Sequence, residues 1–284
     1  MPDHILVFDI GTTSVRAMVV DASGMPCSLA ARANQLQYPA PGLIEQDPEA
    51  LWKLTVEVKE QALNEASLAP ADIGVIGITA QRSSIVVWEK STVRPLAPVI
   101  SWQDLRGVAA AEALQAQGHM VIPNMAASKL ESVIDSIDNG RARMQAGQLA
   151  WGNVDTFIIA RLTAGRTHAM DLSHLSATGY FNYVDGLNEG LVQAQNLDLS
   201  LFPSIGDTAQ NYGETDPGVF GASTMIGAIV ADQQSATIAQ GCNKPGLGKV
   251  TYGTSGTIDI NTGSDLKMAS GAYPLVLRNQ GQNI

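Results

Sequence analysis

The stretch Ile5-Leu6-Val7-Phe8-Asp9-Ile10-Gly11-Thr12-Thr13-Ser14 decides the fold of this chain. A short apolar run, β-branched in part, ends at a carboxylate and a glycine, and this pattern predicts a buried strand. Gly11 lets the backbone turn tightly and approach a ligand closely. Residues 15–21 predict a second strand, so the segment forms a hairpin. It is therefore not the strand-to-helix loop of Walker nucleotide sites, whose G-x-x-x-x-G-K-[ST] motif is missing from the sequence.

The polar turn of this hairpin is suited to holding a phosphate group and its metal ion. Thr12, Thr13 and Ser14 offer hydroxyl and backbone N–H donors to phosphate oxygens. Asp9 lies where it can face a hydrated Mg²⁺, which prefers carboxylate and phosphate oxygens. An ordinary hairpin with a polar turn explains the same residues, and the segment alone leaves both interpretations open.

Composition limits the class of protein. The 284 residues suffice for one large domain or two modest ones, and a hydrophobic content of 45% is that of a globular protein. A net charge of −10 disfavours a nucleic-acid partner. The first four residues are too polar for a signal peptide, and the absence of an 18-residue apolar run disfavours a membrane span. Two cysteines, Cys27 and Cys242, are expected to be buried thiols in a reducing cytoplasm.

Apolar runs and helical spacings alternate along the chain and predict a mixed α/β domain with inserted helices. The predicted strands are three within 4–34, then 73–80, 85–89 and 226–230, and a final pair at 250–254 and 258–262. The predicted helices are 48–67, 105–117, 128–137 and 153–162, and one that follows Asp232.

Five separated blocks of the sequence resemble one protein family, and they occur in the same order as in that family. They are Phe8 to Ser14 with Arg16, Gly77 to Arg82, Ser101 to Asp104 with Arg106, Ala231 to Gln234, and Thr251 to Gly256. With them the chain resembles the N-terminal half of the FGGY carbohydrate kinases, especially the glycerol kinase branch. The resemblance implies an actin-like, ribonuclease-H-like α/β fold, with a mixed sheet and flanking and inserted helices. It also implies that residues 1–284 are the substrate-binding domain, without the C-terminal nucleotide domain.

The reaction implied by the resemblance is transfer of the ATP γ-phosphoryl group to a polyol or sugar hydroxyl, with Mg²⁺. Asp232 matches the family's general base, although a helix N-cap explains an aspartate at this position equally simply. Asp9 matches the metal-side carboxylate. The positions that match phosphate contacts are Thr12, Thr13, Ser14, Arg16 and Thr254.

The same resemblance assigns the substrate side of the site. Arg82 matches a substrate-binding arginine, with Gln81 beside it. A structural ion pair with Asp104 or another carboxylate is the alternative for Arg82. Trp102 matches an aromatic residue that lines the cleft, although most tryptophans are core residues. Gln233 is placed to bond a substrate hydroxyl beside Asp232.

The sequence departs from glycerol kinases at two substrate positions. Ser83 stands where they carry glutamate, and Asn124 where they carry an aromatic residue. Loss of a hydrogen bond to a charged acceptor typically costs about 1.5–3 kcal/mol. The departures disfavour glycerol and leave another polyol or sugar as an equal expectation.

The resemblance covers about half of a normal family member, which leads to three further expectations. The isolated chain has little or no kinase activity, because the adenine pocket and one wall of the cleft are missing. A catalytically silent sugar- or polyol-binding module of the same fold is the alternative function. An exposed cleft wall favours a homodimer. A different actin-like ATPase is disfavoured by the blocks at 81–82 and 231–234.

Overall fold

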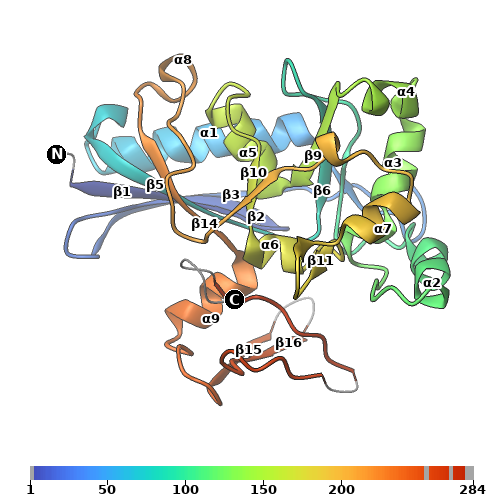
Figure 1. Ribbon diagram of the computed structural model, residues 1–284. Coiled ribbons are helices and arrows are strands. Elements are labelled where there is room, and N and C mark those ends of the chain that lie inside the picture. Colours follow the sequence, from blue (N-terminus) through green and yellow to red (C-terminus); the bar gives the residue numbers. More distant parts are fainter. Residues whose placement is uncertain (1–2, 253–255, 269–270, 279–284) are drawn as a thin grey trace.

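The computed structural model describes residues 3–252, 256–268 and 271–278 of this α/β protein (Figure 1). Its main element is a mixed five-stranded sheet in the order β14-β5-β1-β2-β3. Strands β1, β2 and β3 pair antiparallel, whereas β5 and β14 run parallel to β1. The strands are β1 His4–Ile10, β2 Ser14–Val20, β3 Pro26–Ala33, β5 Ile73–Ala80 and β14 Met225–Ala231.

Helix α1 (Pro48–Glu65) packs on β2 and β3 and closes one core. It begins at Asp47, whose carboxylate accepts hydrogen bonds from the first-turn N–H groups, and Pro48 suits the first helical position. Leu51 and Val58 lie on its buried face and are fully covered. Burial of such an aliphatic side chain contributes about 1.5–3 kcal/mol. Helix α5 (Val154–Leu162) contributes to the same core.

A second sheet lies between this hydrophobic core and a second hydrophobic core. It contains β4 (Glu45–Gln46), β6 (Ile85–Glu89), β7 (Arg94–Pro95), β8 (Val99–Ile100) and β9 (Leu149–Asn153). Alternate residues of β6 and β9 point to opposite faces, so Trp88 joins the first core and Trp151 the second. The second core is covered by α2 Val108–Ala116, α3 Leu130–Ser136, α4 Gly140–Gln145 and α7 Glu189–Ala194.

Shorter elements complete the described chain. They are η1 Pro70–Asp72, η2 Ala126–Ser128, β10 Ala169–Asp171, α6 Leu172–Ser176, β11 Phe181–Asn182, β12 Gly186–Leu187, η3 Leu199–Leu201, β13 Ser204–Gly206, α8 Pro217–Phe220, α9 Asp232–Ala239, β15 Gly248–Tyr252 and β16 Gly256–Ile260. The β15–β16 hairpin and α9 lie below the main body in Figure 1. Among the described residues, no helix has the length and apolar character needed to cross a bilayer.

Most predicted elements are confirmed, including the strands at 73–80 and 85–89 and the long first helix. The helix predicted from Leu105 starts only at Val108, because residues just before it form a turn in which Asp104 accepts the Arg106 N–H. The helix predicted from Ser128 starts at Leu130, after a 3₁₀ turn. Cys27 is exposed, which corrects the prediction of two buried thiols; Cys242 is buried.

Candidate functional site

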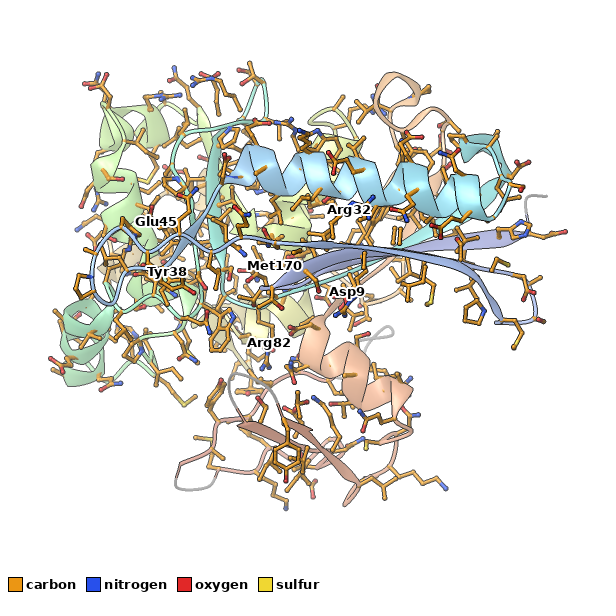
Figure 2. All side chains as sticks on the ribbon, turned by 180° about the vertical axis from the view of Figure 1, so that it is seen from behind. Asp9, Arg32, Tyr38, Glu45, Arg82 and Met170 are labelled. Atoms are coloured by element: carbon orange, nitrogen blue, oxygen red, sulfur yellow. The ribbon has the colours of Figure 1, made fainter. Side chains whose placement is uncertain are left out.

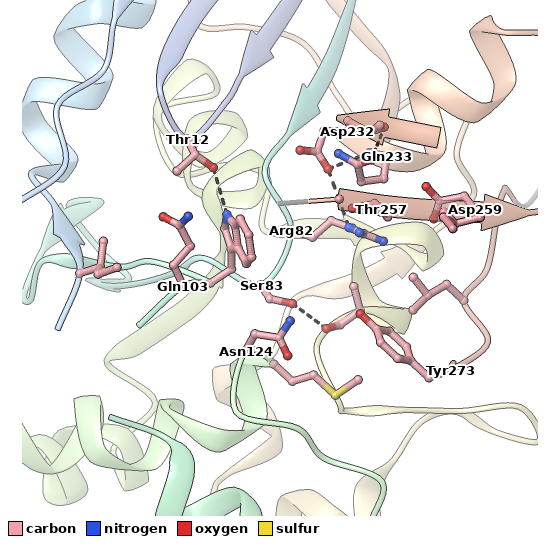
Figure 3. Close-up of a pocket in the computed structure, with 18 of the residues that line it drawn as sticks. Thr12, Arg82, Ser83, Gln103, Asn124, Asp232, Gln233, Thr257, Asp259 and Tyr273 are labelled. Atoms are coloured by element: carbon pink, nitrogen blue, oxygen red, sulfur yellow. Dashed lines mark hydrogen bonds and ion pairs between the residues drawn. The ribbon is translucent and has the colours of Figure 1, made fainter. Parts of the chain in front are cut away.

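The ends of three parallel strands converge on one cavity. Ile10 of β1, Ala80 of β5 and Ala231 of β14 are register partners, so the residues that follow them leave the sheet at the same edge. Ligands of open α/β sheets bind beyond such carboxyl ends. Thr12, Arg82 and Asp232 line a cavity of about 880 Å³ there, and Figure 3 shows them around it.

Asp232 and Arg82 form the charged centre of this cavity. The Arg82 Nε lies 3.8 Å from the Asp232 Oδ1, and the Arg82 guanidinium also donates to Gln234 Oε1 at 3.5 Å. Burial raises the pKa of the Asp232 carboxyl, Arg82 opposes the rise, and the charge of Asp9 adds to it. A carboxylate that is partly desolvated and held beside a cation is suited to accept a proton from a hydroxyl.

Of the alternative interpretations of these residues, the helix N-cap is wrong and the ion pair of Arg82 is confirmed with a partner other than Asp104. Ala231, not Asp232, is the N-cap of α9, and Asp232 is the first helical residue, with its Oδ1 accepting the Gln233 N–H at 2.7 Å. Arg82 pairs with the Asp232 carboxylate and not with Asp104. The Asp104 carboxylate is fully buried and accepts hydrogen bonds from Arg106 and from the Ile44 N–H.

Asp9 lies at the same end of the sheet as Arg82, as Figure 2 shows, but does not line the cavity. It lies opposite Arg16 in the β1–β2 pair, and the Arg16 Nη1 donates to its Oδ2 at 2.8 Å. Burial raises the pKa of Asp9, and Arg16 opposes the rise. The structure thus pairs Arg16 with Asp9, outside the lining of the cavity, and the phosphate contact of Arg16 stays a prediction.

The donor set fits a magnesium ion held partly by phosphate. The described part of the chain contains no group of three or more His, Cys, Asp or Glu residues placed to hold a metal. Mg²⁺ in kinase sites usually takes only one or two carboxylates, with water and phosphate oxygens as its other ligands. Asp9, within electrostatic reach of Asp232, is suited to that role.

In the turn after β1, two backbone segments lie so close together that a glycine is favoured at position 11. The Gly11 N–H donates to the Ser14 carbonyl at 2.9 Å, and a Cβ on Gly11 would lie 3.0 Å from that oxygen. Thr12 and Thr13 line the cavity, and their N–H groups donate no hydrogen bond within the described residues. Ser14 is the first residue of β2 and lies outside the lining, and Thr254 falls outside the described residues.

The Thr12 hydroxyl is already used within the protein. It donates to Gln81 Oε1 at 3.1 Å and accepts from the Trp102 Nε1 at 3.0 Å, so a phosphate contact at Thr12 would come from its N–H. Gln81 is fully buried and also donates to Gln46 at 2.9 Å and accepts from the Ser84 hydroxyl. It does not line the cavity, which corrects the prediction that it contacts substrate; it holds the turn in place instead.

Trp102 and Gln103 line the cavity from the loop after β8, as the resemblance implied for Trp102. The Asp104–Arg106 ion pair at 2.8 Å fixes this loop. Lys129, fully covered, donates to the Ser101 carbonyl at 2.9 Å, and burial lowers its pKa to about 7.

The wall opposite Asp232 carries small or neutral polar side chains. Ser83, Asn124 and Ala177 line it, with Tyr273 nearby in Figure 3. Ser83 has a φ of +57°, in the left-handed region that side chains other than glycine rarely adopt, and its hydroxyl donates to the Ala177 carbonyl at 2.6 Å. Such strain is typical of functional sites.

Sequence reasoning missed three cavity-side residues near the C-terminal end of the described chain. Thr251 and Asp259 line the cavity, and Lys249 lies buried between them. Lysine is rarely fully buried, and no local pattern around 249 predicts it; only the packing of the hairpin on α9 does.

Comparisons with known proteins identify the family of this chain. The model for the N-terminal domain of the FGGY family of carbohydrate kinases matches residues 4–239. Glycerol kinases of Rhodospirillum centenum and Ralstonia pickettii are 38% and 37% identical over 92% of this chain, which covers 54% and 55% of them. The chain therefore spans about half the length of the curated relatives it matches.

Solved structures show the same fold. A Plasmodium falciparum glycerol kinase with ADP superposes with a TM-score of 0.91 at 23% identity, over 99% of this chain and 59% of that one. A xylulose kinase from Rhodospirillum rubrum gives a TM-score of 0.78 at 22% identity, over 90% and 54%. With the family model matched along most of its length, the chain belongs to the FGGY family of carbohydrate kinases and has the actin-like, ribonuclease-H-like fold of their N-terminal domain.

Proposed function

We propose that this chain is the acceptor-binding half of an ATP- and Mg²⁺-dependent kinase that phosphorylates a hydroxyl of a polyol or sugar. The observation that carries the proposal is the placement of Asp232 and Arg82, 3.8 Å apart, in the cavity at the converging strand ends. A bound hydroxyl there meets a base and a cation together.

In this proposal Asp232 takes the proton of the attacking hydroxyl at its carboxylate. A base in this position contributes about 10²–10⁴ in rate. Arg82 keeps that carboxylate ionised against the effect of burial and offers donors to neighbouring hydroxyls. The free N–H groups of Thr12 and Thr13 bind phosphate oxygens. Mg²⁺, held on the Asp9 side, neutralises charge on the transferred phosphoryl group when it is bound.

We propose an acceptor longer than glycerol. The cavity of about 880 Å³ lies within the range of sites that enclose larger ligands. Ser83, Ala177 and Asn124 leave room on the wall away from Asp232, and the Ser83 hydroxyl is already committed to a carbonyl.

A silent polyol-binding module is the second candidate, and one observation favours it. The carboxylate assigned to the metal is paired with Arg16 at 2.8 Å, which is the arrangement of a site that needs no ion. Titration of the chain with Mg²⁺ and inorganic pyrophosphate discriminates, because pyrophosphate needs no adenine pocket. The kinase proposal expects the two together to perturb Asp9, and the silent module expects no change.

A thermal-shift panel of polyols, pentoses, hexoses and their acids tests the proposal directly. A true ligand at 100 times its Kd raises stability by about 2.7 kcal/mol. Arg82→Met is expected to abolish the shift, whereas Arg166→Met, at an exposed ion pair outside the cavity lining, keeps it. A panel without any ligand contradicts the proposal. We also expect the isolated chain to show no ADP release with ATP and the ligand.

A further inference from the structure

We propose that Lys249 is a positioning residue that sets the orientation of the Gln233 side-chain amide beside Asp232. Its functional meaning rests on the proposed acceptor site, but its geometry does not. Gln233 follows the proposed base on α9, and Lys249 reaches it from β15. Both Gln233 and the other two partners of Lys249 line the cavity.

The Lys249 ammonium is buried and lies against three side-chain oxygens. Its Nζ donates to Gln233 Oε1 at 2.6 Å and to Thr251 Oγ1 at 2.7 Å, and it lies 3.0 Å from Asp259 Oδ2. Its side chain is 0% exposed, so no solvent competes for these contacts. Two of these oxygens accept hydrogen bonds from the ammonium, and the Asp259 carboxylate supplies the opposite charge as an ion pair.

The chemistry of the donors fixes which end of the Gln233 amide faces the lysine. An ammonium group only donates, so the atom against it must be the amide oxygen and not the NH₂ group. The Thr251 hydroxyl accepts a hydrogen bond from Lys249 and donates one to the same Gln233 Oε1 at 3.2 Å. Two donors therefore hold Oε1, and flipping the amide would place NH₂ against two donors.

The consequence is a defined donor at the cavity. With Oε1 held, the Gln233 Nε2 hydrogens have no hydrogen-bond partner among the described residues and remain for a bound molecule. The cavity thus offers an acceptor carboxylate at Asp232 next to an amide donor at Gln233. A single ligand hydroxyl matches this pair, because it gives its hydrogen to Asp232 and presents a lone pair to Gln233.

The test uses side-chain amide NMR of the chain without any ligand, so it stands apart from the ligand panel. Lys249→Met keeps the aliphatic stem and removes the donor. We expect the Gln233 Nε2 resonances, distinct in the wild type, to shift to the averaged values of a freely rotating glutamine. Asp259→Asn is the matched control: it alters another partner of Lys249 and is expected to leave the Gln233 resonances in place.

Two results would overturn the proposal. One is a folded Lys249→Met variant whose Gln233 resonances match the wild type; the other is an Asp259→Asn variant that moves them as far as Lys249→Met does. If Lys249→Met does not fold, hydrogen exchange of the Lys249 Nζ signal in the wild-type protein still tests the proposal. A buried ammonium that donates two hydrogen bonds and pairs with a carboxylate gives a slowly exchanging Nζ signal at neutral pH, and fast exchange of that signal contradicts the geometry.

Discussion

Replacing Arg82 by methionine tests the electrostatics at the proposed base. The substitution keeps an unbranched apolar side chain and removes the guanidinium that lies 3.8 Å from the Asp232 carboxylate. Burial already raises the pKa of Asp232, and Arg82 is the first group that opposes the rise. Removing it therefore raises the pKa of Asp232 further, and the carboxylate is less ionised at neutral pH.

The size of the effect follows from the separation. Coulomb's law at 3.8 Å gives about 1 kcal/mol in a water-like medium and about 4 kcal/mol at the effective dielectric constant of a protein surface. The side chains of Arg82 and Asp232 are only 16% and 30% exposed, which favours the upper part of that range. Each 1.4 kcal/mol lost corresponds to about a tenfold change in the protonation equilibrium of Asp232.

The assay is a pH titration of the Asp232 side-chain carboxyl by ¹³C NMR in the wild type and Arg82→Met. Arg166→Met is the matched control, because its partner is Asp216 at 2.7 Å and neither residue lines the cavity. We expect the titration midpoint of Asp232 to rise in Arg82→Met and to stay in Arg166→Met. An unchanged or lowered midpoint in a folded Arg82→Met protein refutes the reasoning.

Three further predictions concern stability and association. Asp104→Ala leaves the Ile44 N–H without its acceptor and Arg106 with Glu45 as its ionic partner, so it is expected to cost about 1–3 kcal/mol in urea unfolding, and an unchanged stability contradicts this. Burial lowers the pKa of His174 to about 3, so its contribution to stability is complete above about pH 6.5 and is lost as the pH falls. His174→Gln is expected to reduce the loss of unfolding free energy between pH 7 and pH 5 by about 2 kcal/mol, and an unchanged pH slope argues against it. Ile258 and Tyr252 are 71% and 89% exposed on the hairpin, so we expect the isolated chain to self-associate, which a monomer in light scattering excludes.

The sequence predicted the elements of this fold that depend on local patterns. The apolar runs of β1, β5 and β14 specify buried strands, and Pro48 after Asp47 specifies the start of α1. The pairing of those strands, which brings Asp9 and Asp232 to one edge, came only from the resemblance. No local signal relates two residues that lie more than two hundred positions apart.

The errors arose where long-range contacts decide the role of a side chain. Gln81 follows a strand end like Arg82, but Gln46 and Thr12 draw it into the interior. Arg16 remains a predicted phosphate contact, and its pairing with Asp9 follows only from the β1–β2 register. Lys249 could not be predicted, because its three partners come from α9 and both strands of the hairpin.

A crystal structure of this chain with the tightest-binding compound of the panel tests the central claim most directly. The account predicts a ligand hydroxyl oxygen about 2.6–3.2 Å from the Asp232 carboxylate, with other hydroxyls against Arg82 and the wall formed by Ser83 and Asn124. A ligand bound elsewhere, or one in this cavity whose hydroxyls do not reach Asp232, would contradict the assignment of the base and with it the proposed function.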